Sequence, residues 1–356
     1  QAALGGALAG VERPAAAVRR FGPAVKELPW DIETGMGYFF ALSDAGRYRR
    51  AATHLAEHTE RQAHWRGGSF LGEYSANQAP IEADVAAGVG KAWAGGPQAA
   101  TGWPGNLTEI APASADLHLG LAEVELVRGR PRAAMIEAHR ALALEPVSVS
   151  AQSVALECRI ETGDWAGIGA EFDRLRPAHP LDDDLDAAWS VWRWETAPSI
   201  EWEVTHGRSD GVESPGKETI FRGSARSAGF GPDQRLSLSV GETSEWAFFP
   251  EGDAEEHRAG ASLRAVLGDQ IWRIGGGAVE RGGFFGSLNW EWQATDALAF
   301  TAVGELDSLE APLRGRRAGV TADRLTVGGE WSWFGQGGLS WSASRPRDAR
   351  PTRWGR

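Results

Sequence analysis

The pattern of apolar and polar positions changes near residue 198. Before this point apolar residues recur at helical spacing, and after it they alternate with polar residues, with tryptophan often on the apolar side. Trp202 lies between Glu201 and Glu203, and Trp290 and Trp292 flank Glu291. Successive side chains of a strand point to opposite faces, so these stretches predict strands with aromatic residues on one face and carboxylates on the other. The chain is therefore expected to join an all-α half to an antiparallel β half.

A period of 34 residues runs through the first half of the chain. Gly163 follows Gly129 by 34 residues, and Pro180 follows Pro146 by the same interval. Glycine commonly ends a helix and proline commonly lies just past its end, so each interval is read as a helix, a turn and a second helix. This period is typical of the tetratricopeptide repeat, whose units stack into a solenoid with a concave binding surface.

The helical repeat domain is expected to span residues 1–195, and its clearest repeats are expected at 113–146 and 147–180. Small residues fall where the two helices of a unit must approach closely, namely Ala122 in the first helix and Ala134 in the second. The fold class is thus α + β multidomain, with an N-terminal solenoid of tetratricopeptide type.

Residues 196–356 are expected to form part of an antiparallel transmembrane β-barrel. The expected strand centres lie near residues 202, 221, 238, 247, 263, 273, 289, 301, 325 and 340. This spacing suits strands that cross a membrane at a tilt, and a tryptophan-rich face is typical of strands that meet lipid near the membrane–water interface. A soluble all-β sandwich is the alternative, because its strands also alternate.

Composition narrows the choice of partners. The 356 residues carry a formal net charge of −12, which argues against nucleic acid because phosphate contacts need a basic surface. Cys158 is the single cysteine, so an intrachain disulfide is excluded, and we expect it to be a small core residue. The chain lacks a run of about 18 apolar residues. Because it begins with Gln1 and ends in an arginine-rich segment, we expect a fragment whose C-terminal strands are truncated.

One string suggests zinc chemistry. His54-Leu55-Ala56-Glu57-His58 matches the H-x-x-E-H pattern of inverted zinc peptidases, and the two histidines would share one helix face. A third ligand is missing, and the string lies in a weaker repeat unit at about 32–60, so a surface helix is the preferred interpretation. We expect no enzyme activity, no metal and no cofactor.

Two further strings have simpler structural readings. Asp182-Asp183-Asp184 with Asp186 is expected to start a helix, where carboxylates favour the positive end of the helix dipole. Gly275-Gly276-Gly277 lacks a phosphate-loop lysine and is expected to be a strand kink or a place of close approach.

Six carboxylates of the strand half are the candidate binding residues. They are Glu201, Glu203, Glu291, Glu305, Asp307 and Glu330. If the apolar residues beside them face lipid, these carboxylates face the lumen and form a negatively lined conduit that favours a cationic polymer. The alternative is that they pair with lumenal arginines and serve stability. The arginines in question are Arg222, Arg226, Arg264 and Arg273.

Several local sequences carry a family resemblance. They are Thr101-Gly102-Trp103-Pro104, the repeat Ala115–Pro146 ending in Ala-Leu-Ala-Leu-Glu-Pro, Thr162-Gly163-Asp164-Trp165, and Trp192-Arg193-Trp194-Glu195 followed by Trp202-Glu203. With helical repeats placed before a barrel, the chain resembles the poly-β-1,6-N-acetyl-D-glucosamine export porins of Gram-negative biofilm formers. The cellulose export porin shares this plan.

The resemblance implies a role in polysaccharide secretion. It places the barrel in the outer membrane of a Gram-negative bacterium and the repeats in the periplasm, where they would dock a deacetylase. The acidic barrel would pass partly deacetylated, and so positively charged, poly-N-acetylglucosamine into the biofilm matrix. About ten strands are visible, fewer than the family's barrel has, so this stretch would leave strand edges unpaired. A soluble repeat scaffold with an all-β domain is the alternative function.

Overall fold

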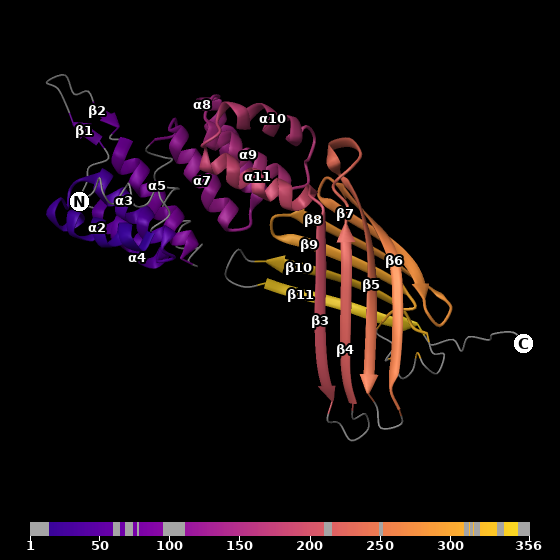
Figure 1. Ribbon diagram of the computed structural model, residues 1–356. Helices are drawn as coiled ribbons and strands as arrows, with labels where there is room; N and C mark the ends of the chain where they lie inside the picture. Colours follow the sequence, from indigo (N-terminus) through magenta and orange to yellow (C-terminus); the bar gives the residue numbers. More distant parts are fainter. Residues whose placement is uncertain are drawn as a thin grey trace, which may run out of the picture. The chain divides into compact units, whose positions relative to one another are not determined.

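The chain folds into helices followed by an antiparallel sheet (Figure 1). The computed structural model describes residues 14–59, 65–67, 74–76, 78–94, 111–209, 216–248, 252–309, 313, 316, 321–332 and 338–347. The chain divides into two compact units, with the main boundary between Cys158 and Arg159. The lead-in at Thr101–Pro104 and the turn signals at 210–215 lie outside the described residues.

The first unit is built mainly of helices. Their bounds are α2 Pro14–Glu27, α3 Ile32–Asp44, α4 Tyr48–Thr59, α5 Gln78–Trp93, α7 Ala115–Val127, α8 Pro131–Leu144 and α9 Val149–Glu161, the last of which reaches the unit boundary. A two-stranded antiparallel ribbon joins β1 Trp65–Gly67 to β2 Tyr74–Ala76. Phe39, Leu42 and Leu55 are almost fully buried in the core of α2–α5. No helix in the described ranges is long and apolar enough to cross a membrane.

The 34-residue period is present in the helices themselves. Helices α7, α9 and α11 begin at residues 115, 149 and 183. Gly129 and Gly163 adopt left-handed φ angles of 69° and 72°, which lets the chain turn after α7 and α9 without the strain that a Cβ would cause. Ala122 and Ala134 are completely buried between their helices. The tetratricopeptide-like helix pairing is therefore confirmed for the described repeats.

In the described part of the second unit, the end of α9 is followed by two further α-helices, a short 3-10 helix at Pro232–Gln234 and the sheet. The helices are α10 Ile168–Ala178 and α11 Asp183–Thr196. The strands are β3 Ser199–Ser209, β4 Gly216–Arg226, β5 Leu236–Phe248, β6 Ala254–Leu267, β7 Gln270–Val279, β8 Phe284–Thr295, β9 Leu298–Leu306, β10 Asp323–Ser332 and β11 Gly338–Arg347. Each strand lies beside its neighbour in sequence, in the order β11 to β3.

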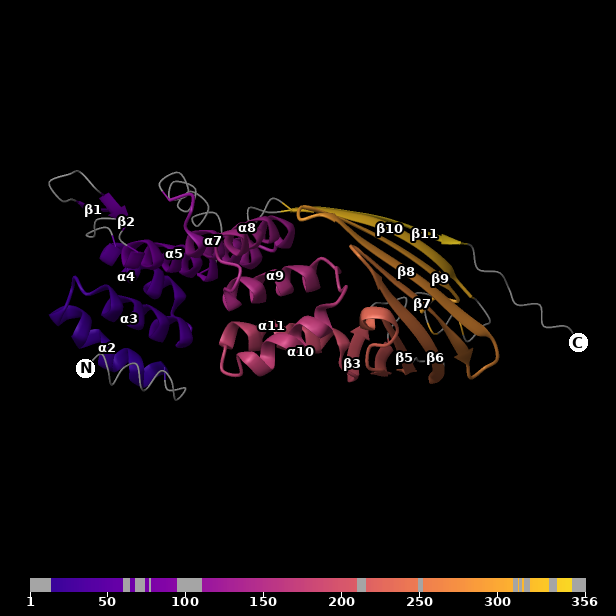
Figure 2. The same ribbon diagram turned by 90° about the horizontal axis from the view of Figure 1, so that it is seen from above.

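The sheet is curved and open. Within the described residues it has nine strands, and β3 and β11 form its two edges, as Figure 2 shows. The expectation of a transmembrane barrel is therefore met only as an antiparallel sheet, which is not closed. A closed barrel requires the first and last strands to pair with each other. Here each described strand pairs with its neighbours in sequence, but β3 and β11 do not pair with each other.

One strand prediction is wrong. Separate strands were expected near residues 238 and 247, but both belong to β5. Gly241 and Glu242 between them remain in register with β4 on one side and β6 on the other. A glycine inside a strand does not end it when both neighbouring ladders continue, so the sheet overrides the local signal.

Helix α11 is bonded to the sheet and to the connection after β4 within the second unit. The Arg264 guanidinium donates to the Glu195 carboxylate over 2.8 Å, and Arg226 donates to the Trp194 carbonyl over 2.9 Å. The backbone N–H of Gly229 donates to the Thr196 carbonyl over 2.7 Å. The secondary structure thus changes after Thr196, whereas the compact units divide at Cys158, and the domain boundary expected at 195/196 stays a prediction.

Candidate functional site

The two faces of the sheet have different character. Directly paired residues of neighbouring strands share a face, so the strand register assigns every described side chain to one side or the other. We call the side that carries Trp202, Ile274 and Leu288 the apolar face, and the side that carries Glu201, Ser262 and Phe285 the polar face.

The apolar face carries the strands' strongly exposed large apolar side chains. These residues are Ile200, Trp202, Val204, Leu238, Val240, Phe248, Leu263, Leu267, Ile274, Phe284, Leu288, Leu306, Leu325, Val327, Trp331, Leu339 and Trp341. Their exposed fractions run from 40% for Val327 to 85% for Phe284. Glu242 and Glu255 share this face beside His257, at one end of β5 and β6. An exposed apolar surface this large on a folded unit is typical of a surface that a protein or lipid partner covers.

Aromatic residues on the apolar face gather near the strand ends. At the end marked by the tight turns 268–269 and 296–297, the rings of Trp272 and Trp290 lie 6.0 Å apart, and those of Trp292 and Phe300 lie 5.5 Å apart. The Trp290 and Trp292 indoles donate to side-chain oxygens of Gln270 and Asp269 respectively. An indole with a partly buried ring and a hydrogen-bonded N–H suits a boundary between an apolar and a wet region.

All six predicted carboxylates lie on the polar side of the sheet. Glu201 is paired in register with Ser224, Glu203 with Arg222, Glu291 with Thr301, and Glu330 with Ala299. Glu305 is paired with both Ser287 and Arg324, and Asp307 follows β9 at a left-handed φ of 51°. Alternation thus assigns the five carboxylates within strands to one face, whereas Asp307 lies there through its contact with Arg258, and the role of all six in binding stays a prediction.

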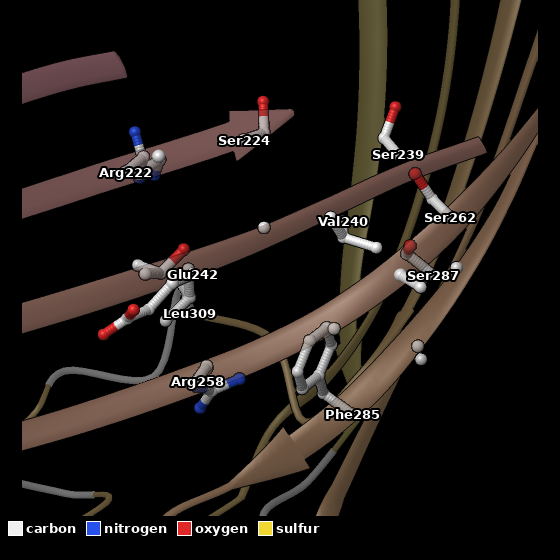
Figure 3. A pocket seen from close by; sticks show the side chains of 18 of the residues that line it. Arg222, Ser224, Ser239, Val240, Glu242, Arg258, Ser262, Phe285, Ser287 and Leu309 are labelled. Carbon is white, nitrogen blue, oxygen red and sulfur yellow. The ribbon is translucent and has the colours of Figure 1, made fainter. Parts of the chain in front are cut away.

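A cavity of about 710 Å³ occupies part of the polar face (Figure 3). Glu201, Glu203, Glu305 and Asp307 are among the residues that line it. Glu291 and Glu330 belong to the same face but lie outside the cavity lining. The sheet therefore brings four of the six carboxylates around one space and leaves two further along its surface.

Two of the six carboxylates are paired with arginines named as alternatives. Arg222 donates to Glu203 over 2.9 Å, and Arg273 donates to Glu291 over 2.5 Å. Arg222 and Glu203 are both well exposed, so water screens their pair and the carboxylate stays within reach of a ligand. In the described part of the chain, Glu201 and Glu330 have no ion-pair partner.

A buried charge cluster at one end of the polar face was missed by the sequence analysis. Arg316, between β9 and β10, pairs with Glu245 and Glu256. Arg258 donates to Glu256 over 2.8 Å, and all four side chains are at least 95% buried. Glu245 and Glu256 are directly opposed across β5 and β6, and two like charges in that position require a cation. Only the register between β5 and β6 shows that these two glutamates face each other, so the sequence pattern could not predict the cluster.

The residues around this cluster are packed against the sheet. Leu313 forms a small apolar group with Ala247 and Ala254, and the carboxylate of Asp307 lies 3.6 Å from Nη2 of Arg258. The connection after β9 thus contacts the polar face at Leu313 and Arg316. Because the two arginines and two glutamates of the cluster neutralise one another, the cluster holds this connection against the sheet without adding net charge to the polar face.

The histidine string of α4 serves the helical core. His58 is buried, and its Nε2 lies 3.1 Å from the Asp31 carbonyl oxygen. Burial lowers the pKa of His54 to about 4, assisted by the nearby charges of His58 and Arg50. Across the described ranges, no cluster of three or more His, Cys, Asp or Glu side chains could hold a metal ion. The zinc peptidase hypothesis therefore lacks a third ligand there.

The remaining sequence motifs take structural roles. Asp182 caps α11, since its carboxylate accepts a hydrogen bond from the Leu185 backbone N–H over 2.8 Å, which confirms the expected helix start. Cys158 is fully buried among helices, as expected of a core residue. Gly275 lies in β7, where an added Cβ would come within 2.9 Å of the Ser262 side chain.

Comparison with known proteins leaves the family open. No protein-family model matches the chain, and no curated protein matches it. Among solved structures, a thermophilic TPR protein of Thermus thermophilus is similar, with 21% sequence identity and a TM-score of 0.42. The similar region covers 54% of this chain and 96% of that protein. The tetratricopeptide-like assignment rests on the spacing and packing of the helices themselves, and membership of the export porin family stays a prediction.

Proposed function

We propose that the sheet is part of an outer-membrane β-barrel that exports a polysaccharide, with the helical repeats holding a periplasmic partner. The polymer would be partly deacetylated poly-N-acetylglucosamine secreted into the biofilm matrix, in line with the family resemblance. The supporting observation is the separation of strongly exposed large apolar side chains onto one face of the sheet and the six candidate carboxylates onto the other.

The apolar face supports lipid as its partner phase. Strands of about 9–11 residues suffice to cross a membrane at a tilt, and strands β3 to β11 span between 9 and 14 residues. Tryptophans near the strand ends, with aliphatic residues such as Ile274 and Leu288 between them, match the aromatic girdle and apolar band of membrane barrels. A water-exposed sheet would gain nothing from this arrangement.

The polar face supports a polymer that carries amines. Glu201 and Glu330 are without ion-pair partners in the described part of the chain, and the Glu203 pair is exposed enough to exchange its arginine for a ligand ammonium. Partial deacetylation converts acetamido groups into ammonium groups. Carboxylates spaced along one wall would then attract the polymer weakly at several points, as conduction requires.

The helical repeats support the docking of a protein partner. The helix pair α7–α8 recurs one period later as α9–α10, and stacks of such pairs present an extended concave surface. The resemblance names a periplasmic deacetylase as the partner. A deacetylase held at the repeats would modify the polymer immediately before export.

The test combines membrane insertion with export. The outer-membrane fraction of cells making the protein should contain a band that migrates differently in boiled and unboiled samples. The double variant Glu201→Gln/Glu330→Gln should lower secretion of partly deacetylated polymer several-fold while leaving that band intact. Glu280→Gln, in the β7–β8 turn, is the matched control and should export normally. A soluble protein without a heat-modifiable band would reject the porin and favour the scaffold.

A further inference from the structure

Phe285 is an aromatic side chain on the polar face of the sheet. Its neighbour Phe284 belongs to the apolar face and is 85% exposed, as the alternation predicts. Phe285 breaks that pattern, because it belongs to the polar face and lines the cavity with serines, arginines and carboxylates, as well as with Val240 and Leu309 (Figure 3). A large aromatic ring on this face calls for an explanation other than packing against lipid.

Missing side chains on two neighbouring strands make room for the ring. Gly277 of β7 is paired in register with both Phe285 and Gly260 of β6. A Cβ added at Gly260 would come within 2.7 Å of Phe285 Cζ, and one added at Gly277 would come within 2.7 Å of Cε1. The ring therefore lies over the bare backbone of β7 and β6. One side of it covers the glycines, and the other is turned to the cavity.

A row of hydroxyls runs beside the ring. Ser239 of β5 is paired with Ser262 of β6, and Gly275 of β7 connects Ser262 to Ser287 of β8 in the same register line. All three serines line the cavity, and Ser287 lies two residues from Phe285 on the same strand. Each hydroxyl can both donate and accept a hydrogen bond, as a sugar hydroxyl partner must.

Arg258 adds a positive charge beside the cavity. Its side chain is 95% buried, lines the cavity, and has its guanidinium carbon 5.8 Å from the centre of the Phe285 ring. Its Nε donates to Glu256, and its Nη2 lies 3.6 Å from the Asp307 carboxylate. Arg258 is therefore held in place beside the ring by these carboxylates.

We infer that this cavity is a saccharide subsite in which a neutral pyranose unit of the polymer stacks on Phe285. The C–H groups of one sugar face would contact the ring, and the serines would exchange hydrogen bonds with the hydroxyls of the sugar. The inference rests on the proposed function and deepens it. Arg258 and Asp307, beside the ring, are paired, which favours an N-acetylated unit over an amine at this point, whereas Glu201 elsewhere in the same cavity suits a cationic unit.

The test measures the affinity of the full chain in detergent for an oligosaccharide, by calorimetric titration up to millimolar ligand. The probe is a fully N-acetylated β-1,6-linked glucosamine pentasaccharide. Phe285→Ala should weaken binding about tenfold, since an aromatic contact of this kind is worth up to about 1.5 kcal/mol. Phe285→Trp should retain the affinity, and Phe284→Ala, which removes the neighbouring ring from the apolar face, should leave it unchanged.

The outcomes separate the subsite from the export function. Equal affinity of wild type and Phe285→Ala, with both showing the heat-modifiable band, would overturn the subsite and leave export standing. Failure of the wild-type chain to bind the pentasaccharide would overturn it as well. Absence of the band in the wild type would instead reject the barrel. A loss of affinity in Phe284→Ala equal to that in Phe285→Ala would show a general structural effect and count against the subsite.

Discussion

The helical repeats and the sheet use apolar residues in opposite ways. In the repeats Leu117 is fully buried and Phe39 is 1% exposed, whereas in the sheet Ile274 is 58% exposed and Trp331 is 49% exposed. Burial from water stabilises the first region from within its own fold. In the second region a charged cluster is buried and many large apolar side chains are exposed, so burial of apolar side chains contributes less within the sheet itself. The difference shows that one chain can bury its apolar residues in one region and expose them in another.

Removal of the buried cation should produce the largest effect. Arg316→Met leaves Glu245 and Glu256 facing each other without that cation, and breaking a buried ion pair from one side costs about 3–5 kcal/mol. The midpoint of the heat-modifiability transition should fall sharply. Adding Glu245→Gln and Glu256→Gln to the same chain should restore much of the loss, because the repulsion is then gone. An unchanged midpoint in Arg316→Met would show that the cluster does not hold the sheet.

A matched pair of leucine truncations sharpens the comparison directly. Leu117→Ala opens a cavity in the helical core and should lower the free energy of unfolding by about 2–5 kcal/mol. Leu288→Ala removes the same atoms from an exposed position on the apolar face and should change it by about 0.5 kcal/mol or less in detergent. Denaturant titration followed by circular dichroism measures both. Equal losses would mean that the two regions do not differ in the way described.

A smaller effect is expected from pH in the helical unit. His54 Nε2 is buried and has no hydrogen-bond partner among the described residues, and burial lowers the pKa of this side chain to about 4 from 6.5. As the pH falls, His54 is protonated in the unfolded chain before it is protonated in the folded chain. Its contribution to the free energy of unfolding is therefore complete above pH 6.5 and is lost as the pH drops toward 4. With allowance for partial exposure the loss is about 1–2 kcal/mol.

The variant His54→Gln isolates this contribution. It should flatten the pH dependence of the helical unfolding transition between pH 6.5 and 4, relative to the wild type. Other groups titrate in the same range, among them Asp44, whose pKa is raised by burial, but they are common to both chains. Identical slopes in the two chains would show that His54 is not the titrating group.

Much of the fold follows from short-range sequence patterns. The 34-residue interval between glycines predicted the helix pairs, because each pair needs the same turn at the same place. Alternation placed the five carboxylates within strands on one face, because the strand period is two in every strand. The number of strands was overestimated at β5, where the ladders on both sides, rather than the local sequence, decide where a strand ends.

The candidate site was only partly predictable. Arg222 and Arg273 could be named as partners of the candidate carboxylates, but which carboxylate each would meet depended on register. Arg316 lies 60 residues from Glu256 in sequence, and Phe285 is accommodated by glycines of two other strands. Such contacts join distant parts of the chain, and a periodic pattern carries no information about them.

By itself the sequence determined the change from helices to strands, the repeat length and the face to which each candidate carboxylate within a strand belongs. These properties come from the geometry of the helix, the strand and the turn, which act over a few residues. Tertiary structure alone decided the register between strands, the pairing of Arg316 with two glutamates and the exposure of the Phe285 ring. Those features depend on which strands become neighbours, and that choice is made by the packing of the whole sheet.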